Sequence, residues 1–181
     1  MAMTGRHVNE DLFLSIAAGR DIVHGHLASP EFRSFTAEGI VWVNQAWLSH
    51  LLYYISFQSF GPLGPVLIKG LLLFGCLWMV FVRCRALGVS VEISLLGLWA
   101  GLLAATPFLA NRPENFGVFF LLLFSRLLTS TGLPRSVRLP AIPLVLAVWS
   151  NCHGSFMLGI GLLGTKCALD TLCSLFPQIG I

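Results

Sequence analysis

"LGPVLIKGLLLFGCLWMVFV", residues 63–82, is the stretch that decides the fold of this chain. Lys69 is its one charged residue. A helix of this length, at about 1.5 Å per residue, covers the roughly 30 Å hydrocarbon core of a bilayer. The next residues, "RCRALG", carry Arg83 and Arg85. An apolar run that ends in a short basic loop is typical of a membrane helix, so we expect a fold built from such spans.

The composition of the whole chain predicts the same class. Of its 181 residues, 56% are hydrophobic and 10% are charged, and the mean hydropathy is +0.82. A soluble domain has about a quarter charged residues, so too few charges remain here to cover a surface that faces water. The net charge is only +3 and the basic residues lie in short loops, so we expect no nucleic-acid partner. We predict an all-α, polytopic integral membrane protein.

Three further apolar runs follow the first. They cover about residues 89–110, 115–128 and 139–176, and "WSNCHGS" interrupts the last. We therefore predict four or five transmembrane or half-membrane helices within residues 62–181. Two of the loops between these runs are basic: the one between the first and second runs and the one between the third and fourth. They hold Arg83, Arg85, Arg126, Arg135 and Arg138.

These arginines predict the orientation of the spans. The positive-inside rule places both basic loops in the cytoplasm. Alternation then puts residues 1–61 and the turn "NRPEN", 111–115, on the outer side of a bacterial inner membrane. Residues 1–61 hold five of the eight acidic residues, and we interpret them as an extracytoplasmic loop.

Two interfacial helices are expected within residues 1–61. Apolar residues at 12, 13, 16 and 17 predict a short amphipathic helix that ends near Gly19. The Trp- and Tyr-rich run "WVNQAWLSHLLYYISF", 42–57, fits a helix lying in the headgroup region.

The interruption at residues 151–154 leaves two interpretations open. Residues 140–150 are too few to span a bilayer, so a half-helix could stop there and leave His153 near the outer face. Alternatively, 139–164 is one kinked span with His153 near mid-membrane. Polar groups at membrane depth are costly unless they are paired or face water, so Arg112, Glu114, Asn151 and His153 indicate a site.

Four segments, in this order, resemble motifs of the bacterial GT-C membrane glycosyltransferases. They are "EDLFLSIAAGRDIVHGH" (10–26), "SFTAEGIVWVNQAWLSHLLYY" (34–54), "RPENFGVFF" (112–120) and "WSNCHGSFMLGIGLLG" (149–164). More narrowly, the chain is similar to the branch related to protein mannosyltransferases and lipopolysaccharide glycosyltransferases. The resemblance covers about residues 10–164 and implies transfer of a sugar from a polyprenyl-phosphate donor to an acceptor hydroxyl on the extracytoplasmic face.

The resemblance also implies roles for particular residues. Asp11 occupies the position of an essential acid in the first outer loop, where a carboxylate can take the proton of the acceptor hydroxyl. Glu31 stands where relatives usually have a second loop acid, and Asn44 lies in the Trp-Val-Asn segment. Arg112 suits the leaving phosphate through its fork of donors. The remaining candidates for binding the donor or its sugar are Asn151 and His153.

Each candidate also has an ordinary structural interpretation. Asp11 could cap the first helix, and Arg112 could form a local ion pair with Glu114. Asn151 could cap a broken helix, and His153 could be a packing residue. Lys166 and Asp170, four positions apart, are expected to pair on one helix face.

The chain departs from the family pattern at two motifs. Phe13, Leu14 and Ser15 stand where relatives have Trp-Trp-His, and Gln45 and Ala46 stand where relatives have His-Glu. The alternatives are therefore a non-catalytic membrane subunit or degenerate relative, or a fragment of a transporter or flippase. We expect the chain to be the N-terminal part of a larger enzyme.

No cofactor is predicted. The five cysteines form no CxxC pair, and the spacing of His24, His26 and Glu31 is not a standard zinc pattern, so a divalent metal has no support in the sequence. The expected partners are the polyprenyl-phosphate-linked sugar, the lipid bilayer and an acceptor of unidentified class.

Overall fold

The computed structural model describes residues 10–30, 36, 39–105, 110–130 and 132–176. Over these residues the chain is helical apart from one short pair of strands, as the predicted all-α class requires. The helices are α1 (Glu10–Val23), α2 (Trp47–Phe60), α3 (Leu63–Ala86), α4 (Val91–Ala105), α5 (Glu114–Thr129), α6 (Arg135–Cys152) and α7 (Phe156–Leu175).

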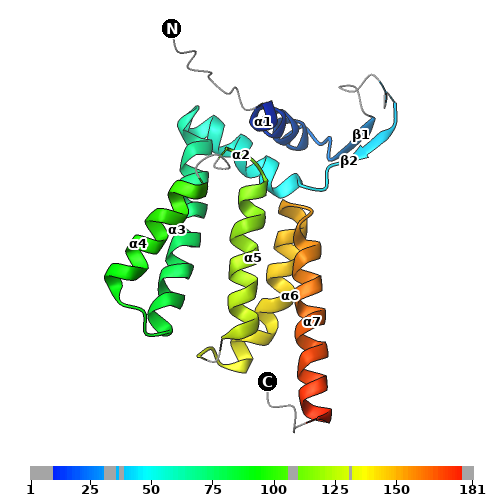
Figure 1. Cartoon of the computed structure of the whole chain (residues 1–181). Helices are drawn as coiled ribbons and strands as arrows, with labels where there is room; N and C mark the ends of the chain where they lie inside the picture. The colour runs from blue at the N-terminus through cyan, green and yellow to red at the C-terminus, as the bar shows by residue number, and fades with distance from the viewer. Residues whose placement is uncertain (1–9, 31–35, 37–38, 106–109, 131, 177–181) are drawn as a thin grey trace.

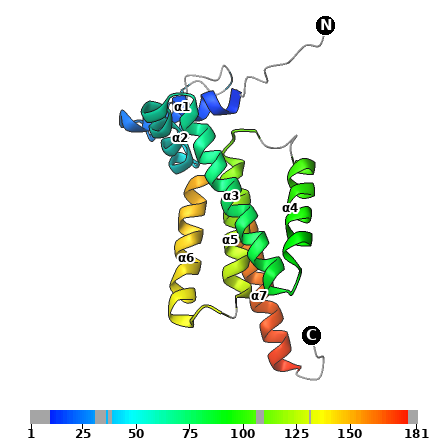
Figure 2. The ribbon, with the colours of Figure 1, turned by 90° about the vertical axis from the view of Figure 1, so that its left-hand side faces the viewer.

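The helices form two groups with different directions. Helices α3 to α7 run alongside one another as an up-and-down bundle, and α1 and α2 lie across one end of it (Figure 1). Turned by 90°, the same arrangement is seen from the side, with α4 on the outside of the bundle (Figure 2). The contacts agree, since α1 packs on α2, and α4 packs on α3.

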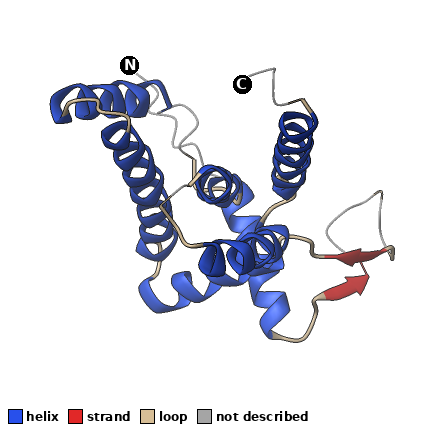
Figure 3. Cartoon of the chain, turned by 90° about the horizontal axis from the view of Figure 1, so that it is seen from below, coloured by secondary structure: helices blue, strands red, loops and turns tan. Residues whose placement is uncertain are grey.

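A short antiparallel ribbon replaces the beginning of the second predicted interfacial helix. Strand β1 (Ala28–Pro30) pairs with β2 (Val41–Val43), and Ala28 lies opposite Val43 (Figure 3). The prediction of a helix from residue 42 was therefore wrong at its start, because Val-Trp-Val favours an extended backbone and α2 begins only at Trp47. The first helix also continues past Gly19, to Val23.

The bundle helices match the predicted apolar runs with two corrections. Helix α6 begins at Arg135, earlier than the predicted 139, and it keeps Pro140 and Pro143 inside it. The chain then reverses, because His153 has an extended backbone (φ −164°) and α7 starts at Phe156. The interpretation of 139–164 as one kinked span is therefore wrong, and His153 lies at the end of the bundle.

Aromatic side chains form the core between α2, α5 and α6. Phe124 and Trp149 are fully buried, and the rings of Phe120 and Trp149 stack with centroids 6.2 Å apart. Tyr53 of α2 contacts Phe116 edge-to-face at 5.8 Å. The core therefore joins the transverse helix α2 to the bundle.

Much of the outer surface of the bundle is apolar. Leu71 is 71% exposed, Phe74 66% and Trp99 60%. Two of the described helices are long and apolar enough to cross a membrane: α3, with a mean hydropathy of 2.2, and α7, with 1.4. Helix α4 is a shorter apolar helix. The other bundle helices do not meet this criterion, so it supports fewer spans than the four or five predicted from the sequence.

Charged residues gather at the two ends of the bundle. We call one end the arginine end: it comprises the C-terminal turns of α3 and α5 and the N-terminal turn of α6, with Arg83, Arg85, Arg126, Arg135 and Arg138. We call the other the polar end: it comprises α1, α2, residues 110–113 and residues 151–155. The up-and-down path of the chain produces this separation (Figure 1).

The crossing of α1 over α2 gives a test of the fold. A Cβ atom at Gly19 would lie 2.2 Å from the His50 carbonyl oxygen and 2.6 Å from Tyr54 Cβ. Gly19→Ala should therefore lower the stability by about 1–3 kcal/mol. It should also speed tryptic cleavage after Arg20, measured alongside thermal unfolding in detergent. Gly70→Ala is the matched control, because a Cβ there meets nothing within 4 Å. Equal stability of the two variants would contradict the crossing.

Candidate functional site

The polar end brings together four of the six site residues predicted from the sequence. Asp11 lies in the first turn of α1, and Arg112 lies just before α5. Asn151 is in the last turn of α6, and His153 follows it. The tertiary structure thus joins three separate segments of the chain at one end of the bundle.

Asp11 and Arg112 form an ion pair. Arg112 Nε lies 2.9 Å from Asp11 Oδ2, and the two side chains are 51% and 50% exposed. The predicted local pair of Arg112 with Glu114 is absent among the described contacts, and the distant carboxylate takes its place. Exposed ion pairs contribute little to stability, so this pair can open at low cost when another anion competes for the guanidinium.

Tyr53 holds the backbone at Arg112 in position. Its buried hydroxyl donates a hydrogen bond to the Arg112 carbonyl oxygen at 3.0 Å. Burial raises the pKa of Tyr53 to about 12, with a smaller opposite effect from a hydrogen bond to Asn115 and a further increase from the charge of Glu114. The phenol therefore keeps its proton at neutral pH and remains a donor.

Two contacts tie α2 to the end of α6. Ser49 Oγ lies 2.9 Å from the carbonyl oxygens of both Ala46 and Cys152, so its single hydrogen is shared between them. Trp47 Nε1 donates to Asn151 Oδ1 at 2.5 Å. The amide nitrogen of Asn151 donates to the Ala147 carbonyl within α6. Asn151 therefore links α6 to Trp47 of α2.

A chain of hydrogen bonds orients the His153 ring. Trp149 Nε1 donates to Ser155 Oγ at 3.0 Å, and Ser155 Oγ lies 2.8 Å from His153 Nδ1. The Ser155 backbone N–H also donates to Nδ1, at 3.1 Å. Nδ1 is therefore an acceptor, and the neutral ring carries its hydrogen on Nε2. No described residue accepts from Nε2, which leaves this half-buried ring one donor for a ligand.

Helix α5 connects His153 to Arg112. A Cβ atom at Gly117 would lie 2.4 Å from Ser155 Oγ and 3.1 Å from His153 Nδ1, so the 153–155 turn packs directly on α5. Arg112 lies just before α5, which begins at Glu114, and Gly117 is in the first turn of that helix. Arg112 and the 153–155 turn therefore both lie at the N-terminal end of α5.

The two remaining predicted residues differ from these four. Asn44 is only 3% exposed, and no described residue bonds to its Oδ1, although its backbone N–H donates to the Leu27 carbonyl. It lies inside the polar end rather than on the surface. Glu31 lies outside the described residues. His24 and His26 are described, but no group of three His, Cys, Asp or Glu side chains within the described ranges is arranged to hold a metal ion.

Sequence reasoning missed the residues that support this site. Ser49 and Tyr53 were included only in an interfacial helix, yet their buried hydroxyls bind carbonyl groups about 60 to 100 positions away. Ser155 was overlooked as the group that orients His153. The available signal was the polar residue types themselves, since a buried hydroxyl requires a partner.

The Tyr53 hydrogen bond supplies a further test. Tyr53→Phe removes one of the two donors to the Arg112 carbonyl, the other being the Asn115 backbone N–H, and should cost about 0.5–1.5 kcal/mol in the free energy of unfolding. Tyr54→Phe is the matched control. Among the described residues, the Tyr54 hydroxyl is hydrogen-bonded only to the exposed Gln58 side chain, whose Nε2 donates to it at 3.0 Å. Thermal unfolding of both variants in detergent measures the difference. An equal loss of stability in both variants would show that the Tyr53 hydrogen bond contributes no more than the exposed one of Tyr54.

Comparisons with known proteins find no relative of this chain. No protein-family model matches the chain, and neither a curated protein nor a solved structure matches it. The function must therefore be argued from the residues and their arrangement.

Proposed function

We propose that the chain is an integral membrane protein whose polar end transfers a sugar from a polyprenyl-phosphate donor to an acceptor hydroxyl. The observation that carries the proposal is the 2.9 Å pair of Asp11 and Arg112, from opposite parts of the chain, at the end that also holds His153. A carboxylate and a guanidinium side by side are the groups that such a transfer needs.

The surface of the molecule supports membrane insertion. Apolar side chains such as Leu71 and Phe74 are exposed along α3, and exposed apolar area on this scale is costly in water. Most charged side chains lie at the two ends of the bundle, while Lys69 of α3 and the Lys166–Asp170 pair of α7 lie along the helices. By the positive-inside rule, the arginine end faces the cytoplasm and the polar end faces outward, where α1 and α2 lie along the interface as transverse helices.

The chemistry at the polar end follows from the donor groups present. Arg112 binds the donor phosphate through its guanidinium fork, and the Nε2–H of His153 donates to a phosphate or sugar oxygen. The acceptor oxygen attacks C1 of the sugar, and its proton passes to Asp11. The bond between C1 and the phosphate oxygen breaks, and polyprenyl phosphate leaves with the electron pair and a charge that Arg112 offsets.

The ion pair gives this reaction an order. While Asp11 and Arg112 are paired, the carboxylate is occupied by the guanidinium. A phosphate that binds Arg112 competes for the same donors and releases the carboxylate next to the reacting sugar. Because both side chains are half exposed, the exchange carries only a small desolvation cost.

The core of the bundle weighs against the transporter alternative. A transport pathway requires polar side chains through the depth of the bilayer. Phe116, Phe120, Phe124 and Trp149 fill the described centre of the bundle instead. Polar residues gathered at one end fit a transferase or a degenerate relative of one, and activity measurements separate these two.

The orientation is tested by labelling engineered cysteines. In a chain without its native cysteines, Gln58→Cys at the polar end should react with a membrane-impermeant maleimide in intact spheroplasts. Leu133→Cys at the arginine end should react only after permeabilisation, because the bilayer shields it. Both positions are exposed in the structure. Labelling of both in intact spheroplasts, or the reverse order, would contradict the orientation.

The catalytic assignment is tested with two variants in membranes that contain the complete protein. Asp11→Asn should lower the transfer of radiolabelled sugar from a polyprenyl-phosphate sugar by about 100-fold or more, because the base is lost. The same variant should bind polyprenyl phosphate at least as well as the wild type, since Arg112 loses its competing carboxylate. Arg112→Gln should weaken that binding by about tenfold.

Two residues of α1 with the same charges provide the controls. Glu10→Gln removes the neighbouring carboxylate of α1, and Arg20→Gln removes an exposed arginine that pairs with Asp21 instead. Both should leave transfer and binding within about twofold of the wild type. Full transfer by Asp11→Asn would overturn the catalytic role and favour the non-catalytic subunit.

A further inference from the structure

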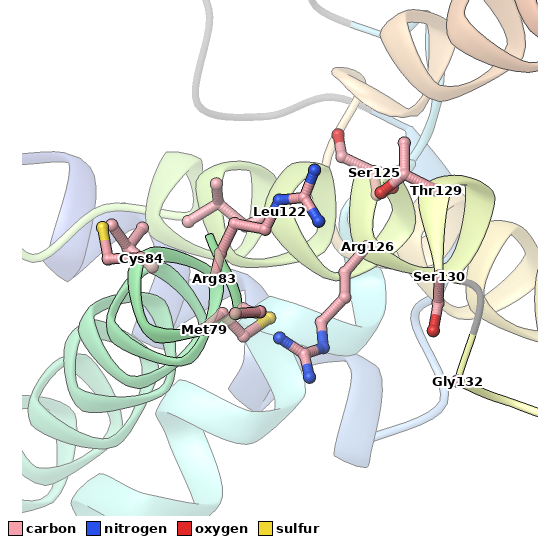
Figure 4. A pocket seen from close by; sticks show the side chains of 11 residues that line it. Met79, Arg83, Cys84, Leu122, Ser125, Arg126, Thr129, Ser130 and Gly132 are labelled. Atoms are coloured by element: carbon pink, nitrogen blue, oxygen red, sulfur yellow. The ribbon is translucent and has the colours of Figure 1, made fainter. Parts of the chain in front are cut away.

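A cavity lies between α3 and α5 at the arginine end, at the opposite end of the bundle from the Asp11–Arg112 pair. Its volume is about 480 Å³, and Figure 4 shows the side chains around it. Arg83 extends into it from the last turn of α3, and Arg126 from the last turn of α5. In the sequence, both arginines indicate only the orientation of the spans.

Both guanidinium groups belong to exposed residues, and no described residue supplies a counter-charge to them. Within the described residues neither Arg83 nor Arg126 forms an ion pair or a side-chain hydrogen bond, and no carboxylate lines the cavity. Glu92, in the first turn of α4, is the acid nearest in sequence to Arg83, but it does not line the cavity and forms no ion pair with either arginine among the described residues. Asp170 of α7 is paired with Lys166 at 2.5 Å. Two unpaired cations that face one cavity are a favourable environment for an anion with several oxygens.

Hydroxyl groups add little to this recognition. Ser125 and Thr129 line the cavity, but their hydrogens are donated to backbone carbonyls one turn back, at 2.7 and 2.9 Å. The helix C-termini also carry partial negative charge, which opposes an anion. The guanidinium forks must therefore provide the binding, so removing them should have a large effect.

The walls of the cavity change character along the bundle. Met79 lies one turn before Arg83 on the same face of α3, and Leu122 lies one turn before Arg126 on the same face of α5. Val80 also lines the cavity. The cavity is thus cationic toward the helix ends and apolar toward the middle of the bundle, the pattern of an amphiphile with an anionic head.

We propose that this cavity binds a phosphate group, supplied by an anionic phospholipid of the cytoplasmic leaflet. Arg83 and Arg126 hold the phosphate oxygens, and an acyl chain lies against Met79, Val80 and Leu122. Basic pockets between helices on the cytoplasmic side suit such headgroups. The inference rests on the proposed membrane insertion and its orientation, but not on sugar transfer, and it gives the arginine end a specific ligand.

Lipid binding to the full chain tests this proposal. The chain is purified in a zwitterionic detergent at about 150 mM salt, which screens charges that do not contact the lipid. Native mass spectrometry then counts bound phosphatidylglycerol and bound phosphatidylcholine. The wild type should retain phosphatidylglycerol preferentially, and R83Q/R126Q should bind it about tenfold or more weakly.

The matched control removes the same charge from the same end. R85Q/R135Q neutralises two exposed arginines that do not line the cavity, and it should bind phosphatidylglycerol within about twofold of the wild type. If R83Q/R126Q fails to fold, R83K/R126K replaces it. The lysine variant keeps the charges but loses the forks, so its binding should still fall several-fold.

Three outcomes would overturn the proposal. Equal retention of the two lipids would remove the anion preference. An equal loss in R85Q/R135Q would assign binding to general surface charge rather than to this cavity. Binding of inorganic phosphate that depends on Arg83 and Arg126, without binding of the lipid, would remove the lipid as the source. A loss of sugar transfer has no bearing on these readouts, so this proposal and the catalytic one can fail separately.

Discussion

Two buried hydroxyl groups on α2 hold the polar end together, and the arrangement of the site depends on them. Ser49 bonds to the Cys152 carbonyl at the end of α6, and Tyr53 bonds to the Arg112 carbonyl before α5. The Cys152 carbonyl ends α6 and has no partner within the helix, and a buried carbonyl without a partner is costly. The Arg112 carbonyl also accepts from the Asn115 backbone N–H at 3.1 Å, so Tyr53 adds a second bond there. Helix α2 is thereby fixed across the bundle, and the close contact at Gly19 fixes α1 on α2.

The Asp11–Arg112 pair is a consequence of this frame rather than its cause. Both side chains are about half exposed, and an ion pair in such a position contributes little to folding. In the proposed reaction the pair is exchangeable, because a donor phosphate would replace the carboxylate without disturbing the hydrogen bonds beneath. The His153 ring is more rigidly held, since Trp149 and Ser155 fix its orientation from the protein side.

The two proposed sites share one physical cause. An apolar bundle has few places where charge can be kept, so charged side chains collect where the helices end. At the polar end a cation and an anion face each other, which suits a reaction that exchanges partners. At the arginine end two cations face one cavity without an acid, which suits stable binding of an anion. The aromatic core between the ends separates the two environments.

The sequence by itself determined which apolar runs form the bundle helices and that five arginines gather around two of the loops, although not the starts of α2 and α6. The run 63–82 became α3, and the pairing of Lys166 with Asp170 followed, because apolar runs and contacts four positions apart are local properties of the chain. Only the tertiary structure decided that the chain reverses at His153, that Arg112 meets Asp11 rather than Glu114, and that Asn44 is buried. These outcomes depend on the angles at which helices pack. Close contacts at Gly19 and Gly117, and hydrogen bonds between residues far apart in the chain, set those angles.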